Sequence, residues 1–390
     1  MKPKVKKYFL RFFLSFLISL TFISHSWATD LYFAGFTLIG NANQNDRYPV
    51  ATRLFSKNNE DLNKQLYESI GRLKRNDLNI IKTDLGKIKS GNALSLAFSL
   101  SDERVERIAE KDGVFSFYRV LAQVLVFDVV EKKVITNFPA AVQYQVFTKS
   151  IPSKQDDERE FEKIYMDISF DGSIFKEWVS RLEKINLMEA GIRHLQIRDV
   201  TLDDAVVSQL PSALKVNDIF KIQTAQRLEF QLASNQNVPI LPYAIGQLGN
   251  KKLGILGRFS DGVRYELKLP EPDYVIDVLV REFKSAKIEE KNYDGYVYGA
   301  FITLKVVEPM TESVKLDSKF NYKNELTFQK SAQVQILNDW DVYQRSQDML
   351  FSTLSKQISK RDDVEISKIT STVNIKDQFK EFEEIIKKCK

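Results

Sequence analysis

Residues 115–147, FSFYRVLAQVLVFDVVEKKVITNFPAAVQYQVF, predict two antiparallel β-strands joined by a tight turn. The first half, 115–130, is apolar on both alternating faces, which is typical of a strand covered on both sides. The charged triplet at 131–133 supplies the turn. The second half, 134–147, alternates apolar with polar side chains, as a half-buried strand does. This hairpin predicts a mainly antiparallel sheet.

Helix-spaced apolar residues lie before and after this hairpin and complete the fold class. The two sets are Leu62, Leu66, Ile70 and Leu73, and then Ile174, Trp178, Leu182 and Ile185. Together with further strand patterns in the last third of the chain, they predict an α+β fold: two modules of mainly antiparallel sheet with helices on one face. The charged stretch 150–162 predicts a loop or linker.

An internal duplication is one explanation of the two modules. Ala93–Gly113 and Val275–Gly295 have equal length, and each runs from an apolar strand through a charged stretch to Asp-Gly. A long strand, a turn, a second strand and a helix follow both copies, which lie 182 residues apart. The alternative is two unrelated α+β units that share common patterns. The domains that we predict are 29–190 and 191–365, followed by a C-terminal amphipathic helix at 366–390.

Residues 1–28 predict a cleavable secretory signal peptide. Four lysines between Lys2 and Lys7 form a basic start, and an apolar run follows at 12–23. Ser26-Trp27-Ala28 then supplies a small-x-small cleavage site, so that Thr29 becomes the new N-terminus. The alternative is an uncleaved anchor, but the apolar run is shorter than the about 20 residues that a membrane-spanning helix needs. We expect no transmembrane span in the mature chain.

The net charge of +5 belongs to the export signal. Residues 1–28 hold five of the 57 basic residues and no acidic residue, which leaves 52 basic against 52 acidic residues in the mature chain. This balance excludes the strong positive field of a nucleic-acid-binding protein. Cys389 is the only cysteine, so no intramolecular disulfide can form, and the chain has no Asn-x-Ser/Thr sequon. These features favour a bacterial periplasmic or secreted protein.

No catalytic, cofactor-binding or metal-binding motif is evident. His194 is the only histidine left after removal of the signal peptide, and its apolar neighbours favour a structural role. One histidine and one cysteine cannot supply the usual ligands of zinc or copper. We therefore predict no cofactor and no catalytic residue. A carboxylate pair is the one remaining route to hydrolysis, but no spacing in the sequence indicates such a pair.

A narrow apolar seam marks the C-terminal helix. Its residues, spaced by four, three and four, are Ile375, Phe379, Phe382 and Ile386. The seam either docks the helix on its own domain, binds a partner or a second copy, or lies on a membrane surface. The seam is the candidate partner-binding site that the sequence offers.

The resulting functional expectation is an exported, non-catalytic binding or envelope-assembly protein. Its partner would be another envelope protein or a second copy of the chain, and not a nucleic acid. One alternative is a periplasmic carboxylate-based hydrolase that acts on cell-wall or sugar substrates. The other is an outer-membrane-associated or secreted adhesion factor.

Overall fold

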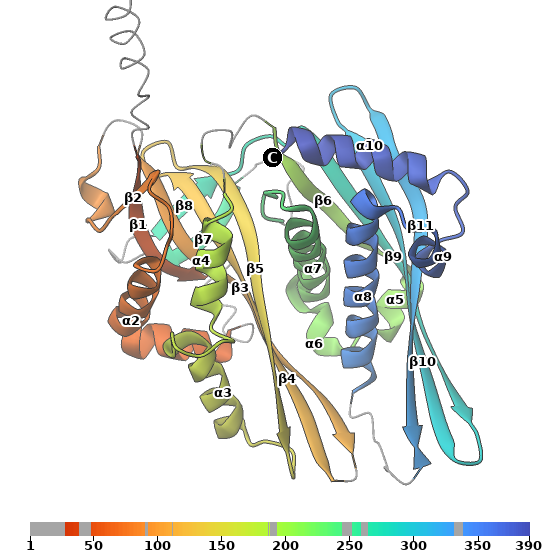
Figure 1. The fold of residues 1–390 in the computed structure, drawn as a ribbon. Coiled ribbons are helices and arrows are strands. Elements are labelled where there is room, and N and C mark those ends of the chain that lie inside the picture. The colour runs from red at the N-terminus through yellow and green to blue at the C-terminus, as the bar shows by residue number, and fades with distance from the viewer. Residues whose placement is uncertain are drawn as a thin grey trace, which may run out of the picture.

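Two β-sheets, one of seven strands and one of four, form the framework of the protein (Figure 1). The computed structural model describes residues 28–38, 48–89, 93–110, 112–185, 187, 193–243, 252–258, 264–330 and 338–390. Apart from Ala28, the predicted signal peptide lies outside the described residues.

The first sheet has the strand order β2-β1-β3-β4-β5-β8-β7. Its strands are β1 (Thr29–Leu38), β2 (Leu78–Ile81), β3 (Leu94–Glu110), β4 (Gly113–Asp128), β5 (Lys133–Thr148), β7 (Lys252–Arg258) and β8 (Arg264–Lys268). β3, β4 and β5 pair antiparallel along their lengths, whereas β1 runs parallel to β2 and β3. β4 and β5 are the hairpin expected at 115–147.

The second sheet, in the order β11-β10-β9-β6, repeats the β5-β4-β3-β1 part of the first sheet. Its strands are β6 (Leu195–Leu202), β9 (Tyr274–Glu289), β10 (Tyr293–Glu308) and β11 (Ser313–Gln329). β9, β10 and β11 pair antiparallel, and β6 runs parallel to β9 as β1 does to β3.

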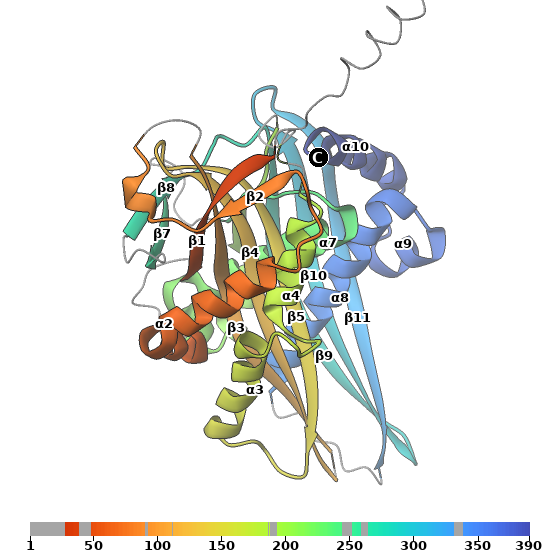
Figure 2. The ribbon, with the colours of Figure 1, turned by 60° about the vertical axis from the view of Figure 1, so that its left-hand side comes forward.

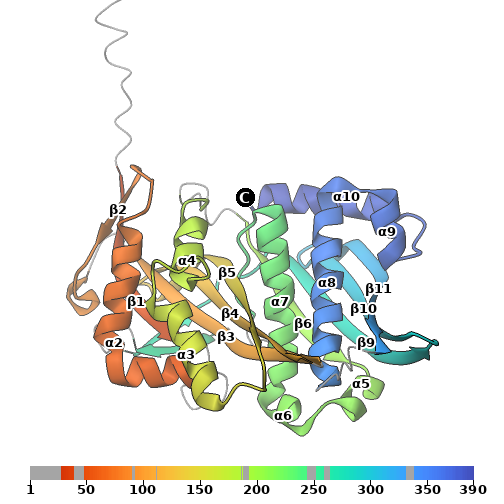
Figure 3. The same cartoon turned by 60° about the horizontal axis from the view of Figure 1, so that its bottom comes forward.

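Helices pack on the same side of both sheets (Figures 2 and 3). α2 (Pro49–Ile70), α3 (Lys154–Met166) and α4 (Ile174–Leu182) accompany the first sheet. α7 (Ile219–Gln236), α8 (Asp339–Lys360), α9 (Asp363–Ile369) and α10 (Ile375–Lys388) accompany the second, with the short helices α5 (Asp204–Gln209) and α6 (Ser212–Lys215) before α7. The predicted α+β class is thereby confirmed. We call β1–β5 with α2–α4 unit one, and β6, β9–β11 with α5–α10 unit two.

One hydrophobic core runs through both units. Phe36, Phe98 and Trp178 of unit one belong to the same buried cluster as Phe220 and Phe283 of unit two. α7 makes the connection, because it contacts β5 of the first sheet as well as β6 and α8 of unit two. β7 and β8 also cross the predicted domain boundary, since they follow β6 in sequence but belong to the first sheet. The domain limits at 190 and 365 stay a prediction.

The two units share their topology in detail. The first residues of β3, β4 and β5 precede those of β9, β10 and β11 by 180 positions each: 94 and 274, 113 and 293, 133 and 313. The last residue of each four-residue turn, Lys132 and Glu312, is left-handed, with φ of 51° and 54°. Tyr118 donates from its hydroxyl to Asp157 on α3, and Tyr298 donates to Asp339 on α8. The duplication itself is not confirmed by a shared topology and stays a prediction.

Two charged stretches differ from their sequence prediction. The loop expected at 150–162 is mostly helix α3, which Ser153 begins by accepting a hydrogen bond from the backbone N–H of Asp156. The strand expected at 93–100 continues as β3 to Glu110. Both stretches keep regular structure because charged side chains in them are paired, for example Arg104 with Gln344 and Glu162 with Arg53.

Candidate functional site

A buried polar cluster joins the two units where β3 and β4 meet α7 and α8. We call it the junction cluster; its members are Asp102, Arg104, Glu106, Arg119, Arg227, Gln344 and Asp348. The three β3 residues alternate along the strand and so share one face. The α8 residues are four positions apart and share one side of the helix. Arg227 is 1% exposed and Asp348 is 6% exposed.

Asp348 and Gln344 hold the arginines of this cluster. The carboxylate of Asp348 forms ion pairs with Arg119, with Arg104 at 3.4 Å and with Arg227 at 3.6 Å. Oε1 of Gln344 accepts hydrogen bonds from Arg104 at 2.8 Å and from Arg227 at 2.6 Å. Burial alone would lower the pKa of Arg119, but the carboxylates of Asp348 and Glu106 raise it above its usual value. The cluster thus contains three arginines and three carboxylates. Because these residues come from both units, their ion pairs connect unit one to unit two.

The opposite face of β3 has a second buried charge with a structural role. Glu103 accepts hydrogen bonds from the backbone N–H groups of Val50 and Ala51, at 2.8 and 3.0 Å, and from the hydroxyl of Tyr165 at 2.9 Å. Burial raises the pKa of Glu103 to about 7. The carboxylate satisfies the first turn of α2, which explains a charged residue inside a buried strand.

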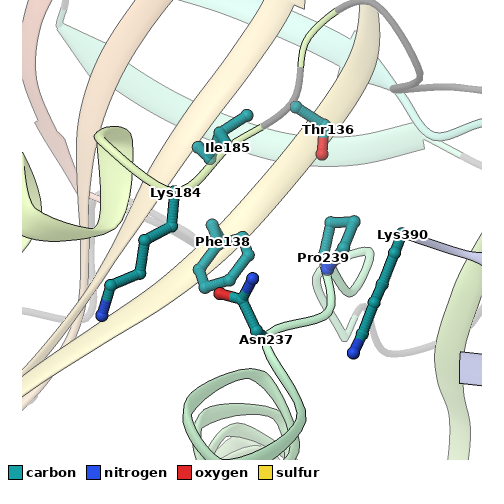
Figure 4. A pocket seen from close by; sticks show the side chains of 7 residues that line it. All are labelled: Thr136, Phe138, Lys184, Ile185, Asn237, Pro239 and Lys390. Carbon is teal, nitrogen blue, oxygen red and sulfur yellow. The ribbon is translucent and has the colours of Figure 1, made fainter. Parts of the chain in front are cut away.

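A pocket of 220 Å³ lies where the units meet near the end of α10 (Figure 4). We call it the junction pocket; its lining residues are Thr136, Phe138, Lys184, Ile185, Asn237, Pro239 and Lys390. They come from β5, from the segments after α4 and α7, and from the residues after α10. Two hydrogen bonds fix the segment after α7 to β5. The backbone N–H of Ile240 donates to the carbonyl of Asn137, and the side-chain amide of Asn137 donates to the carbonyl of Ile240, both at 3.0 Å.

The junction pocket combines an apolar floor with a positively charged rim. Phe138 and Ile185 are 2% and 4% exposed and form the floor. Lys184 and Lys390 flank the opening on opposite sides, with the carboxamide of Asn237 between them (Figure 4). The lining side chains include no carboxylate, histidine or cysteine. This arrangement can bind a ligand through contact and charge.

A second, more open depression of 490 Å³ lies between α2 and α3. We call it the α2–α3 groove; its lining residues are Arg53, Leu54, Arg159, Glu162, Lys163, Met166 and Asp167. Arg53 donates to Oε1 of Glu162 at 2.5 Å and also lies 3.5 Å from Glu158. The groove therefore has a buried apolar base at Leu54 and charged walls.

The C-terminal seam is buried within the chain. Ile375, Phe379, Phe382 and Ile386 are 0–3% exposed. The ring of Phe379 stacks on that of Phe320 at 6.1 Å, and α10 packs on β11 and α8. Gln378 reinforces the contact by accepting hydrogen bonds from the backbone N–H of Asp317 and the hydroxyl of Ser318. The seam therefore docks α10 on its own unit, and partner binding by these side chains would require α10 to leave the core.

His194 and Cys389 both occupy structural environments. The backbone of His194 forms hydrogen bonds with Asp273 and Tyr274 just before β6 begins. Burial lowers the pKa of the His194 imidazole. Cys389 is buried, and burial raises its pKa to about 12. Within the described residues, no group of three or more His, Cys, Asp and Glu side chains is placed to hold a metal ion. No helix in the described part of the chain is long and apolar enough to cross a membrane.

No known family model matches the chain, and no curated protein matches it. Among solved structures it is similar to a minor lipoprotein from Acinetobacter baumannii, with 10% identity and a TM-score of 0.19 over 44% of this chain and 96% of that one. A DUF330 protein from Xanthomonas campestris gives 9% identity and 0.20 over 43% and 81%. A neuraminyllactose-binding hemagglutinin homolog from Helicobacter pylori gives 11% and 0.21 over 43% and 87%. Because these TM-scores are low, we infer neither fold nor function from them.

The sequence patterns predicted neither the junction pocket nor the α2–α3 groove. The junction pocket is assembled from residues between Thr136 and Lys390 that only the folded chain brings together. The α2–α3 groove depends on α3, and the many charged residues of α3 led the sequence pattern to predict a loop there. Ser153 and Asp156 are spaced as a capping box and were the available signal for that helix.

Proposed function

We propose that the chain is an exported, non-catalytic binding protein of the bacterial cell envelope and that the junction pocket is its binding site. The leader at 1–28 supports export, and the balanced charge of the mature chain supports a partner other than nucleic acid. The pocket carries the proposal, since it joins a buried apolar floor to two lysines and an amide. Ligand pockets in general combine an apolar lining with a few placed polar groups.

The size and charge of the junction pocket favour one kind of occupant. A volume of 220 Å³ is below the roughly 300–1,000 Å³ typical of small-molecule sites. It suits a single large side chain or the end of a polypeptide. The lysine rim favours a negatively charged group beside the apolar part. The proposed occupant is therefore a segment of an envelope protein. A carboxylate-based hydrolase receives no support from this pocket, which has no carboxylate side chain.

In-cell photocrosslinking tests this function. A benzophenone amino acid at Lys184 should yield an adduct on irradiation of living cells, whereas the same probe at the exposed Lys215 of α6 should not. Lys390→Glu should reduce the Lys184 adduct because it reverses the charge of one side of the rim. Lys388→Glu, an equal charge change on the neighbouring end of α10, is the control and should leave the adduct unchanged. Equal adducts at Lys184 and Lys215, or none at either position, would reject the pocket as the binding site.

A further inference from the structure

The α2–α3 groove has a topological counterpart in unit two, and unit one covers that counterpart. Asp157 and Asp339, which accept from Tyr118 and Tyr298, set the helix correspondence at 182 positions. The α3 residues of the groove then match residues of α8 as follows: Arg159 with Asp341, Glu162 with Gln344, Lys163 with Arg345, and Met166 with Asp348. The partners from the preceding helices also match, because Arg53 donates to Glu162 as Arg227 donates to Gln344.

In unit two, this helix surface is covered by unit one. Asp341 accepts from the backbone N–H of Arg107, and Gln344 accepts from Arg104. The guanidinium of Arg345 lies 4.2 Å from the ring centroid of Phe117, and Asp348 pairs with Arg119. Three of these α8 residues therefore contact side chains on one face of the β3–β4 hairpin, and Asp341 contacts its backbone.

Unit two carries its own version of that hairpin face, and two of its side chains, Lys284 and Ile288, are exposed. With the strand correspondence of 180, Lys284 matches Arg104, Ile288 matches Ile108 and Val297 matches Phe117. The ion pair between Asp102 and Arg104 recurs as Glu282 with Lys284 at 2.8 Å. The side chain of Lys284 is 64% exposed and Ile288 is 52% exposed. We call this face of β9 and β10, residues 282–299, the β9–β10 ribbon.

We propose that the α2–α3 groove of one molecule receives the β9–β10 ribbon of a second copy, repeating between molecules the contact that joins the two units. One charge pair suits this occupant, because Lys284 would approach Glu162 as Arg104 approaches Gln344. Within the chain, Gln344 accepts from two donors, one on each side. Glu162 already accepts from Arg53 through Oε1, and Oε2 is the atom that the Lys284 ammonium would contact.

The proposed contact is heterologous. Each copy presents one groove and one ribbon, so that every added copy leaves a groove at one end and a ribbon at the other. Assembly would therefore be head to tail. This inference concerns the assembly role within the proposed function and does not depend on the junction pocket. A failed crosslink at Lys184 would therefore not argue against the head-to-tail contact. A monomeric protein would not argue against the junction pocket as a binding site.

Sedimentation velocity of the purified protein tests the contact. The wild type should associate with rising concentration, and added salt should weaken the association because the pair is exposed. Lys284→Glu should weaken it by about tenfold or more, since two carboxylates would then face each other. Lys287→Glu makes the same charge change on the opposite face of the same strand and should leave association unchanged.

A mixing experiment separates this contact from a symmetric one. Glu162→Lys disables the groove but keeps the ribbon, and Lys284→Glu disables the ribbon but keeps the groove. Each variant alone should stay largely monomeric, whereas an equimolar mixture should regain association through the intact groove of one and the intact ribbon of the other. A wild type that is monomeric at every concentration would overturn the proposal. Association that Lys284→Glu leaves unchanged, or that mixing fails to restore, would overturn it as well.

Discussion

Replacing both Phe379 and Phe382 with Ser is expected to unfold the protein or to lower its thermal midpoint severely. Both rings are fully buried, and Phe379 stacks on Phe320 of β11. Truncating one buried phenylalanine costs about 3–5 kcal/mol, so the pair costs about 6–10 kcal/mol before any penalty for the new hydroxyls. The whole stability of an ordinary domain is about 5–15 kcal/mol. Thermal or urea unfolding followed by circular dichroism measures the loss.

Lys380→Ser is the matched control for that double variant. Lys380 lies on the same helix but is exposed, so its replacement should change the free energy of unfolding by less than about 0.5 kcal/mol. A double variant that melts like the wild type would contradict the buried seam. If that variant also lost co-purification or self-association, the seam would be a partner-binding surface instead.

The second large effect is expected from Asp348→Ala. This change leaves Arg104, Arg119 and Arg227 in the junction cluster without the carboxylate that they share. Removing one partner of a buried ion pair costs about 3–5 kcal/mol. Within the cluster, three buried arginines would then face the two remaining carboxylates, those of Asp102 and Glu106. Urea unfolding should show this loss as a lower midpoint.

Asp363→Ala is the control for the junction cluster. Asp363 also pairs with a cation, Lys376, but its side chain is 83% exposed. Exposed pairs contribute about 0–1 kcal/mol. The two aspartate variants should therefore differ clearly in urea midpoint. Equal midpoints would show that the junction cluster does not hold the two units together.

The hydrophobic pattern correctly predicted those elements that bury one apolar face in the core. The hairpin at 115–147 is β4 and β5, with the expected turn at Lys132. The seam of α10 was visible for the same reason, and its docking on the chain's own core was one of the alternatives. Alternation and helical spacing were sufficient in these segments because one face of each element meets the core.

Charged segments were not predictable in this way. The β3 residues from 101 to 110 form a strand because their charges are satisfied by distant partners: Glu103 by α2, and Arg104 by α8. α3 is a helix whose apolar residues are only a small part of its surface. A single-sequence pattern does not contain these partners, so it indicates loops where the fold supplies paired charges. The junction pocket was unpredictable for the same reason, since its walls come from segments that are far apart in the sequence.

Export is the premise of the proposed function, and the N-terminal sequence of the protein made by its own cell tests it most directly. Cells would be fractionated, the protein purified from each fraction, and its first residues determined by Edman degradation or mass spectrometry. The signal at 1–28 predicts a chain that starts at Thr29 and is recovered in the periplasmic extract. A chain that starts at Met1 and is recovered in the membrane pellet or the cytosol would contradict the account.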